Sequence, residues 1–540
     1  MRLDLPADLR RDVDALLADW ESGGKVARLW DGDATLWTGS DESRWLGWLE
    51  IPSEQLSRRE DLLGPAERAR AEGFEHALVL GMGGSSLCPE VLAITFGPVP
   101  GHPRLHILDS TDPVEVLARE RQVPPARTLF IVSSKSGTTL ETDILMRYFL
   151  ECVSETVGAE RAGAQFIAIT DPGSALAQEA GAHGFRAVMD GVPAIGGRYS
   201  ALSAFGMAPG AIAGVDVVEL LGRGRSMAAE CGPDNPGPTN PGLLLGIVLG
   251  AAHNTGRDKL TLVAAHRLAG MGAWIEQLVA ESTGKDGRGI VPVDGEPVGD
   301  PDVYGEDRVF VQMRLAGDAD ERQDAAVETL ARAGRPVVRI ELDDPLDLGG
   351  QFFLWEFATA VAGAVIGVNP FDQPDVEAAK VRTRELTAEY ERSGSLPPAE
   401  ADSEDSLGPH LQRLGTGDYL GLLAFVPRTV EHRRELDAVR LAVRDRMQVA
   451  TTAGFGPRYL HSTGQAHKGG PPGGVFVQLT CDDADDIPVP GRAYTFGAVK
   501  AAQARGDFEV LAERGRRVLR VHLGADVEEG LARLRVVVER

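Results

Sequence analysis

The chain has few cysteines and a deficit of basic residues. Its 540 residues contain four cysteines that lie far apart and in no metal-ligand spacing, namely Cys88, Cys152, Cys231 and Cys481. Cysteines placed in this way favour a reduced, cytoplasmic compartment over an oxidising one in which disulfides form. The 55 Lys and Arg residues against 80 Asp and Glu residues give a net charge of -25. A nucleic-acid partner is not expected, because such a partner requires a basic face on the protein.

Long apolar runs are also missing. The longest apolar stretches, 243–252 and 358–368, are shorter than the ~20 residues that cross a bilayer, so we expect both to be buried helices. The N-terminus alternates charged residues with Leu and Val and lacks the apolar core of a signal peptide. The sequence therefore predicts no membrane partner. It also implies that an anionic ligand is attracted by a local positive field, since the protein as a whole repels it.

The strand and helix patterns predict an α/β fold with two lobes, each a mainly parallel sheet flanked by helices. Residues 1–70 predict a helical N-terminal segment. The first lobe is expected over 71–235 and the second over 240–392, with a Pro/Gly loop between them. Apolar strand patterns alternate with helical ones in both lobes, at 77–81, 105–109, 128–134, 166–171, 259–266, 308–315 and 336–342.

The last part of the chain is harder to assign. Residues 393–409 are acidic and rich in Pro and Ser, which predicts a linker. Residues 410–540 predict a C-terminal α/β segment with strands at 474–480 and 517–523. The sequence leaves open whether this segment is a third domain or part of the second lobe, and whether it completes the active site.

One loop is rich in hydroxyl groups. Residues 134–139, SKSGTT, follow an apolar strand and precede a helical pattern. A strand-to-helix turn exposes backbone N–H groups at the positive end of the helix dipole, and Gly137 permits close approach of a ligand. This predicts a phosphate site. The alternative is an ordinary helix N-cap, which Ser and Thr also favour.

A second loop, 81–87, follows the first predicted strand with the sequence GMGGSSL. It lacks the third glycine of a dinucleotide fingerprint and the Gly-Lys-Ser/Thr ending of a Walker loop. Because the carboxyl ends of neighbouring parallel strands lie at one edge of a sheet, the two loops together favour a phosphate site more than either alone.

Four further motifs complete a pattern: GGRYS at 196–200, AESTGK at 280–285, NPFDQP at 369–374 and HSTGQ at 461–465. With the two loops, they resemble the glucose-6-phosphate isomerase family, which has a two-lobed sugar isomerase (SIS) fold. The likeness is greatest to the isomerase portion of bacterial transaldolase/glucose-6-phosphate isomerase fusions, in which HSTGQ followed by KGGPP also occurs. No transaldolase-sized segment precedes residue 75, so that second activity is not expected.

The resemblance implies reversible isomerisation of D-glucose 6-phosphate and D-fructose 6-phosphate, a step of glycolysis and gluconeogenesis. The reaction moves a proton between C1 and C2 through a cis-enediol and needs a base and a cation. Glu281 matches the family's base, Arg198 the cation beside the enediolate, and Lys380 a residue near the ring oxygen. The matching substrate-binding residues are Ser85, Ser134, Lys135, Ser136, Thr139, Glu141, Gly197 and Gln373. No cofactor or metal is expected.

The ring-opening histidine departs from the family pattern. The family places it between the catalytic Glu and NPFDQP, but residues 282–368 contain no histidine. The matching motif begins at His461, and His266 is the competing candidate. In the family this histidine reaches the active site of the other subunit, which implies a homodimer.

Two other functions are compatible with the sequence. One is an isomerase that also accepts mannose 6-phosphate, because the residues that distinguish C2 epimers are not recognisable. The other is a non-catalytic SIS module that senses phosphosugars, which would need only the two phosphate loops.

Overall fold

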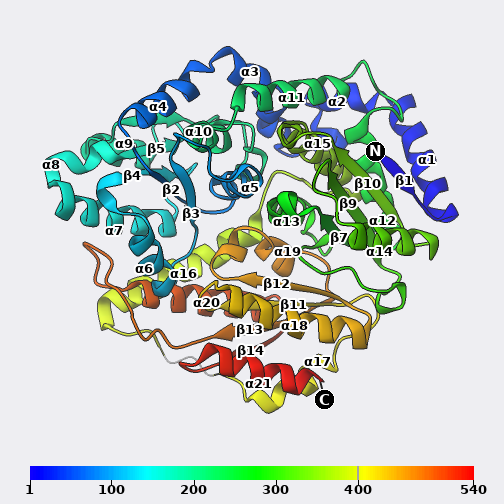
Figure 1. Cartoon of the computed structure of the whole chain (residues 1–540). Helices are drawn as coiled ribbons and strands as arrows, with labels where there is room; N and C mark the ends of the chain where they lie inside the picture. The colour runs from blue at the N-terminus through cyan, green and yellow to red at the C-terminus, as the bar shows by residue number, and fades with distance from the viewer. Residues whose placement is uncertain (398–400, 540) are drawn as a thin grey trace.

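The computed structural model describes residues 1–397 and 401–539. Strands in these residues form three sheets, each flanked by helices (Figure 1). The first sheet is parallel throughout, in the order β3-β2-β4-β5-β6. Its strands are β2 His76–Gly81, β3 Arg104–Leu108, β4 Thr128–Ser133, β5 Phe166–Thr170 and β6 Ala187–Asp190. Strand β6 is an addition to the predicted set.

Helices cover both faces of this sheet, so its central strands are buried. Every residue of β4 is buried, which explains why the strand is apolar along its whole length instead of alternating. The helices of this part of the chain are α3 Ile51–Ser57, α4 Glu60–Ala71, α5 Leu87–Phe96, α6 Pro113–Gln122, α7 Leu140–Val157, α8 Ala159–Ala162, α9 Ala175–Ala182, α10 Ala204–Ile212 and α11 Val217–Glu230.

The second sheet has the order β1-β10-β9-β7-β8. Its strands are β1 Arg2–Asp4, β7 Lys259–Ala264, β8 Val291–Val293, β9 Arg308–Leu315 and β10 Val337–Leu342. Strand β1 is antiparallel to β10, with Arg2 opposite Arg339. The sequence predicted a helical N-terminal segment, but the structure shows that this segment is not wholly helical. Its first residues complete the second sheet before α1 Ala7–Ser22 and α2 Lys25–Trp30 begin.

The two apolar stretches noted in the sequence are core helices. They belong to α12 Pro241–Asn254 and α15 Leu348–Ile366, which pack against each other. Residues 345–366 are long and apolar enough to cross a membrane by composition, but 89% of the apolar window is buried inside the protein. One continuous core joins the N-terminal segment and both lobes. The remaining helices here are α13 Ala269–Thr283, α14 Glu321–Arg332 and α16 Pro374–Ser393.

The C-terminal residues form a third parallel sheet with its own core, and are not an extension of the second sheet. Its order is β12-β11-β13-β14. The strands are β11 Tyr419–Phe425, β12 Ala450–Phe455, β13 Gly474–Thr480 and β14 Arg517–His522, and the helices are α17 Leu407–Leu411, α18 Val430–Met447, α19 Gly464–Gly469, α20 Phe496–Glu513 and α21 Val527–Glu539. Residues 398–400 of the predicted linker lie outside the described residues.

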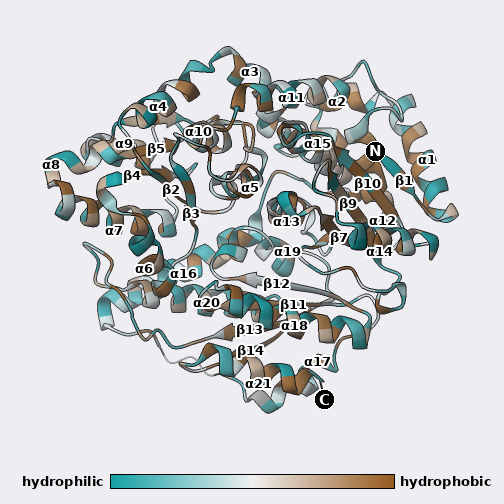
Figure 2. Ribbon diagram, viewed as in Figure 1, coloured by the Kyte–Doolittle hydropathy of each residue, from teal (hydrophilic) through white to brown (hydrophobic). Residues whose placement is uncertain are grey.

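The third sheet unit is fastened to the carboxyl end of the first sheet. Arg458 pairs with Glu90 and, at 2.5 Å, with Asp109 just after β3. Lys500 pairs with Asp112 at 2.8 Å. Helix α16 runs along α20, as Figure 1 shows. In Figure 2 the hydrophobic colouring is concentrated in inner strands such as β9 and β10. The architecture confirms the predicted fold class, parallel sheets flanked by helices, and it places C-terminal side chains beside the phosphate loop.

Candidate active site

The hydroxyl-rich loop Ser134–Thr139 joins the buried strand β4 to helix α7. The Ser134 hydroxyl donates a hydrogen bond to Thr139 Oγ1 at 3.1 Å. Gly137 has a φ of 69°, and a Cβ there would lie 2.6 Å from the backbone nitrogen of Leu176. The turn therefore needs glycine at this position. It leads into a helix of 18 residues, whose N-terminal dipole favours an anion.

The side chain of Lys135 is engaged by groups outside its own loop. Its ammonium group pairs with Asp171, which follows the neighbouring strand β5. It also donates to the backbone carbonyls of Val192 and Pro193 at 3.4 and 3.2 Å. Lys135, like several other predicted site residues, is not among the residues that line the pocket described below. The structure uses this lysine to tie the phosphate loop to an adjacent strand end.

Two other segments approach the glycine-rich loop after β2. Gly83 has a φ of 56°, and a Cβ there would lie 3.0 Å from the carbonyl oxygen of His461. A Cβ on Gly84 would lie 1.9 Å from the carbonyl oxygen of Gly197. Ser85 is buried in the same turn. Glycine is thus required because the backbone of the Arg198 turn and that of the His461 turn both approach this loop directly.

Glu281 lies in the last turn of α13, which ends at Gly284 as the sequence predicted. Its carboxylate is buried, and Oε1 lies 3.3 Å from Nη1 of Arg198. Gln277, one turn earlier, donates from Nε2 to Glu281 Oε2 at 3.1 Å and to the carbonyl oxygen of His461 at 2.7 Å. A carboxylate and a guanidinium therefore lie side by side, and the amide of Gln277 links the carboxylate to the C-terminal unit.

Arg198 also fixes the NPFDQP turn. Its Nη1 donates to Gln373 Oε1 at 2.8 Å, and its Nη2 donates to the carbonyl oxygens of Pro370 and Asp372 at 2.7 and 2.9 Å. Its Nε donates to the hydroxyl of Ser282 at 2.7 Å. With these partners the guanidinium is buried yet hydrogen-bonded, so its position is set by the turn that carries Gln373.

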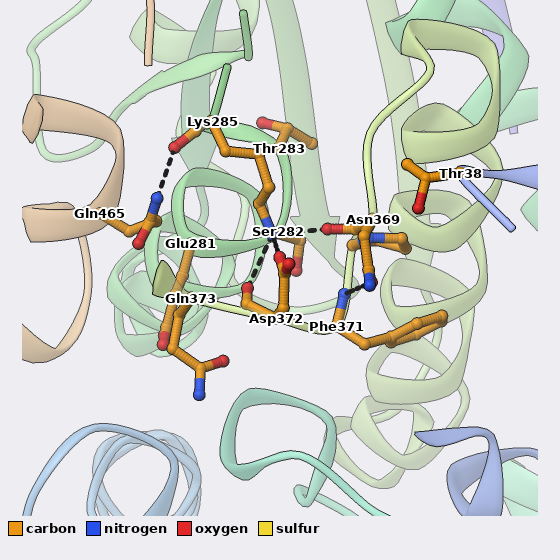
Figure 3. A network of polar contacts seen from close by, with 12 residues as sticks. Thr38, Glu281, Ser282, Thr283, Lys285, Asn369, Phe371, Asp372, Gln373 and Gln465 are labelled. Atoms are coloured by element: carbon orange, nitrogen blue, oxygen red, sulfur yellow. Dashed lines mark hydrogen bonds and ion pairs between the residues drawn. The ribbon is translucent and has the colours of Figure 1, made fainter. Parts of the chain in front are cut away.

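Lys285 holds the same turn (Figure 3). Its Nζ donates to the carbonyl oxygen of Asn369 at 2.5 Å and to Asp372 Oδ1 at 2.6 Å. Burial, followed by repulsion from Arg198, lowers the pKa of Lys285 to about 8. Two buried cations thus fix the chain between Asn369 and Gln373.

Gln465 connects the C-terminal unit to this arrangement. Its Oε1 accepts a hydrogen bond from the backbone nitrogen of Asp375 at 2.9 Å, in the first turn of α16. Its Nε2 donates to the carbonyl oxygen of Gly284 at 3.0 Å, a contact drawn in Figure 3. One side chain from the HSTGQ motif therefore caps α16 and braces the end of α13.

His461 contacts the first lobe within the same chain. Its Nε2 lies 2.8 Å from Oε1 of Glu141, and Gln503 donates to the same oxygen at 2.7 Å. Burial alone would raise the pKa of Glu141, but the charge and hydrogen bond of His461 outweigh it, so the pKa is lowered. The C-terminal segment thus brings a histidine to a buried carboxylate in the first turn of α7.

A pocket of about 250 Å³ opens at this point. The hydroxyl-rich loop, α16 and the C-terminal unit form its walls, and its polar lining includes Ser136, Thr138, Thr139, Glu141, Lys380, Arg384, His461 and Gln503. Lys380 is half-buried and has no hydrogen bond or ion pair within residues 1–397 and 401–539. The pocket therefore presents hydroxyl groups, a carboxylate–histidine pair and an unpaired ammonium group to one small ligand.

The competing histidine does not reach this pocket. His266 is exposed at the start of the short helix η8 His266–Leu268. Within the described part of the chain, no group of three or more His, Cys, Asp or Glu side chains could hold a metal ion. The geometry therefore favours His461 over His266 as the histidine at the ligand.

Sequence reasoning missed several residues of this site. Gln277 lies four residues before Glu281, so helical spacing could have placed the two on one face of α13. Lys285 and Gln465 belong to quoted motifs, but nothing in the motifs assigns them a partner. Gln503 carries no sequence signal, because it reaches Glu141 only through packing of the third sheet on the first lobe.

The comparisons with known proteins agree with this geometry. A family model for phosphoglucose isomerase matches residues 67–296. The solved structure of a hypothetical protein from Thermus thermophilus is similar at a TM-score of 0.59 and 26% identity, covering 71% of this chain and 99% of that one. The glucose-6-phosphate isomerase structure from Chlamydia trachomatis shares the fold at a TM-score of 0.53 and 20% identity, covering 62% of this chain and 74% of that one. The class is therefore a two-lobed α/β protein with the fold of a sugar-phosphate isomerase.

Sequence relatives identify the family within that class. A glucose-6-phosphate isomerase from Rubrobacter xylanophilus is 30% identical over 386 residues, which cover 62% of this chain and 87% of that protein. A second glucose-6-phosphate isomerase, from Thermus thermophilus, is 28% identical over 391 residues, which cover 64% of this chain and 90% of that protein. The chain belongs to the glucose-6-phosphate isomerase family.

Proposed function

We propose that this protein interconverts D-glucose 6-phosphate and D-fructose 6-phosphate by proton transfer between C1 and C2. Family membership supports the substrate, and the buried pair of Glu281 and Arg198 at 3.3 Å carries the chemistry. A sensor of phosphosugars would need the phosphate loop but would have no use for a buried carboxylate held against a guanidinium.

Glu281 acts as the base that carries the proton between the two carbons. Gln277 donates to one of its oxygens, which orients the carboxylate. Arg198 stabilises the enediolate oxygen, because its charge is permanent and adds no exchangeable proton of comparable acidity. The loop Ser134–Thr139 anchors the phosphate, with Ser85 beside it, and the backbone at Gly197 and the amide of Gln373 lie at the sugar.

His461 and Lys380 open the sugar ring in this proposal. Glu141 accepts a hydrogen bond from His461 Nε2, which fixes the proton on that nitrogen and leaves Nδ1 to exchange a proton with the sugar. Lys380 supplies a positive charge near the ring oxygen. Residues 410–540 then act as a unit that completes the active site, since they carry both His461 and Gln503.

Deuterium exchange tests the reaction directly. In D2O, an enediol route should place deuterium from solvent at C2 of glucose 6-phosphate or C1 of fructose 6-phosphate, as seen by NMR. Conversion without any label would contradict proton transfer through a base exposed to exchange.

The variant Glu281→Gln tests the base. We expect kcat to fall by at least ~1,000-fold while the Kd for fructose 6-phosphate changes little, because only the proton acceptor is removed. Glu276→Gln, on the same helix, is the matched control and should keep kcat within a few-fold of wild type. Near wild-type turnover in Glu281→Gln would exclude Glu281 as the base.

Some finer points are also proposals. Isomerisation of mannose 6-phosphate is tested by assaying glucose 6-phosphate and mannose 6-phosphate side by side. Equal turnover would show that the enzyme accepts both aldose phosphates.

The family resemblance supports a homodimer and a cytoplasmic location. The likeness of HSTGQ and KGGPP supports kinship with the isomerase portion of transaldolase fusions. Since His461 contacts Glu141 of the same chain, we propose that each subunit supplies the histidine of its own pocket.

A further inference from the structure

The positive charge at the pocket comes from α16 and not from the phosphate loop. Lys135, the cation within that loop, is engaged with Asp171 and two backbone carbonyls. The lysine and arginine side chains among the pocket's lining residues are Lys380 and Arg384, one helical turn apart on α16. A phosphate dianion approaching a protein of net charge -25 therefore meets the side-chain charges of this helix in addition to the N-terminal dipole of α7.

Arg384 forms an exposed ion pair with Glu377 in the structure. Its Nη2 lies 2.8 Å from Glu377 Oε1, and the two side chains are 58% and 59% exposed. An ion pair that is so exposed contributes little to stability, so the arginine can exchange its partner easily. Glu377 also lines the pocket. Without Arg384, its carboxylate would repel an incoming phosphate.

The spacing between Lys380 and Arg384 suits a hexose phosphate that has its ring at Lys380 and its phosphate at Arg384. Residues four apart on a helix are separated by about 6 Å along the axis. Lys380 is at the sugar-ring end in the function proposed above, and Arg384 lies one turn beyond it. Ser136, Thr138 and Thr139 line the same pocket. A phosphate held by these hydroxyls is thus within the range of a long, exposed arginine.

We propose that Arg384 exchanges Glu377 for the phosphate group of the substrate and replaces Lys135 as the cation of the phosphate site. This inference rests on the proposed function, because it concerns the same pocket and a phosphorylated sugar. Arg384 acts as a substrate-binding residue. Glu377 acts as its resting partner, which neutralises the arginine in the empty pocket and is displaced when phosphate arrives.

The experiment compares Arg384→Gln with Arg392→Gln. Both remove one positive charge from α16, but Arg392 is exposed in the last turn of the helix. The Kd for fructose 6-phosphate, measured by calorimetry, should rise about five- to tenfold in Arg384→Gln, the effect of one charge-assisted hydrogen bond. It should stay within twofold in Arg392→Gln. KM should follow Kd, and kcat should not change.

The variant Glu377→Gln should change the Kd for fructose 6-phosphate in the opposite direction. Removing the competing carboxylate should lower the Kd about two- to threefold, the size of a surface ion pair. In Arg384→Gln/Glu377→Gln, that gain should shrink, because no arginine remains to be released. A purely structural role for the pair would weaken binding in both single variants.

The outcomes separate the two proposals. Equal Kd values for Arg384→Gln and Arg392→Gln, or a weakened Glu377→Gln, would overturn the role of Arg384 even if wild type isomerises the substrate. If wild type binds fructose 6-phosphate without turnover and Arg384→Gln binds it more weakly, the proposed reaction fails while the role of Arg384 stands.

Discussion

Replacing Gly84 with alanine should displace Arg198 from its position against the glycine-rich loop that follows β2. A Cβ on Gly84 would lie 1.9 Å from the carbonyl oxygen of Gly197, whereas real Cβ atoms stay at least 3.0 Å from such neighbours. Because the Gly197 atoms that this Cβ would meet belong to the backbone, no side-chain rotation relieves the clash. The two turns must therefore separate by about 1.1 Å, and Arg198, the next residue after Gly197, must move with its turn.

A shift of that size is large for catalysis. Misplacement by ~1 Å at a reacting group can cost roughly 100-fold in rate, and overpacking of this kind destabilises a protein by about 1–3 kcal/mol. We therefore expect kcat/KM of Gly84→Ala to fall about 100-fold. The assay follows glucose 6-phosphate formed from fructose 6-phosphate by coupling to glucose-6-phosphate dehydrogenase, and thermal melting measures the loss of stability in parallel.

Gly196→Ala is the matched control. It adds the same methyl group two residues before Arg198, but a Cβ there meets nothing within 4 Å. Its kinetics should stay within a few-fold of wild type. If Gly84→Ala melts and turns over like wild type, the close approach of Gly84 to Gly197 does not position Arg198, and the reasoning fails.

Two further predictions concern side chains next to the site. Lys285→Met removes the ammonium group that holds Asn369 and Asp372, so we expect kcat to fall about tenfold and unfolding free energy to drop by about 1–3 kcal/mol, measured by kinetics and denaturant unfolding. Burial, followed by repulsion from Asp294, raises the pKa of Glu276 to about 8 from 4.5, so its contribution to stability is full below pH 4.5 and is lost as pH rises towards 8. Glu276→Gln cannot ionise, so its Tm relative to wild type should rise by roughly 1–3 °C between pH 5 and 8; a constant difference would refute the shifted pKa.

The sequence predicts most strands of the two lobes and, in the C-terminal unit, β13 and β14 but not β11 and β12. Long β-branched runs such as Thr128–Ser133 are unambiguous because both faces of a parallel strand are buried. Strand β1 is three residues long and finds its partner β10 only in the tertiary fold. Strands β11 and β12 contain Gly421 and Gly454, which weaken a strand pattern, and each glycine leaves room for a neighbouring aromatic ring, Phe476 or Tyr459.

Some site residues could likewise be predicted from the sequence and others could not. Motifs identify Glu281, Arg198 and His461, because their neighbours carry a recognisable pattern. They do not show which way a side chain points. Lys135 lies in the phosphate loop by sequence, yet Asp171 at the next strand end captures it. Arg384 lies in no motif, and only the packing of α16 across the loop brings it to the pocket.

Strand β1 has a consequence for how the second sheet closes. Its residues Arg2 to Asp4 pair with Val337 to Arg339 of β10, which lie very far along the chain. A contact between segments so distant in sequence must close a long loop, so it is expected to form late in folding. Until β1 arrives, the outer edge of β10 is open to strands of other chains. Substitutions that weaken this pairing should therefore promote association between copies without changing the pocket.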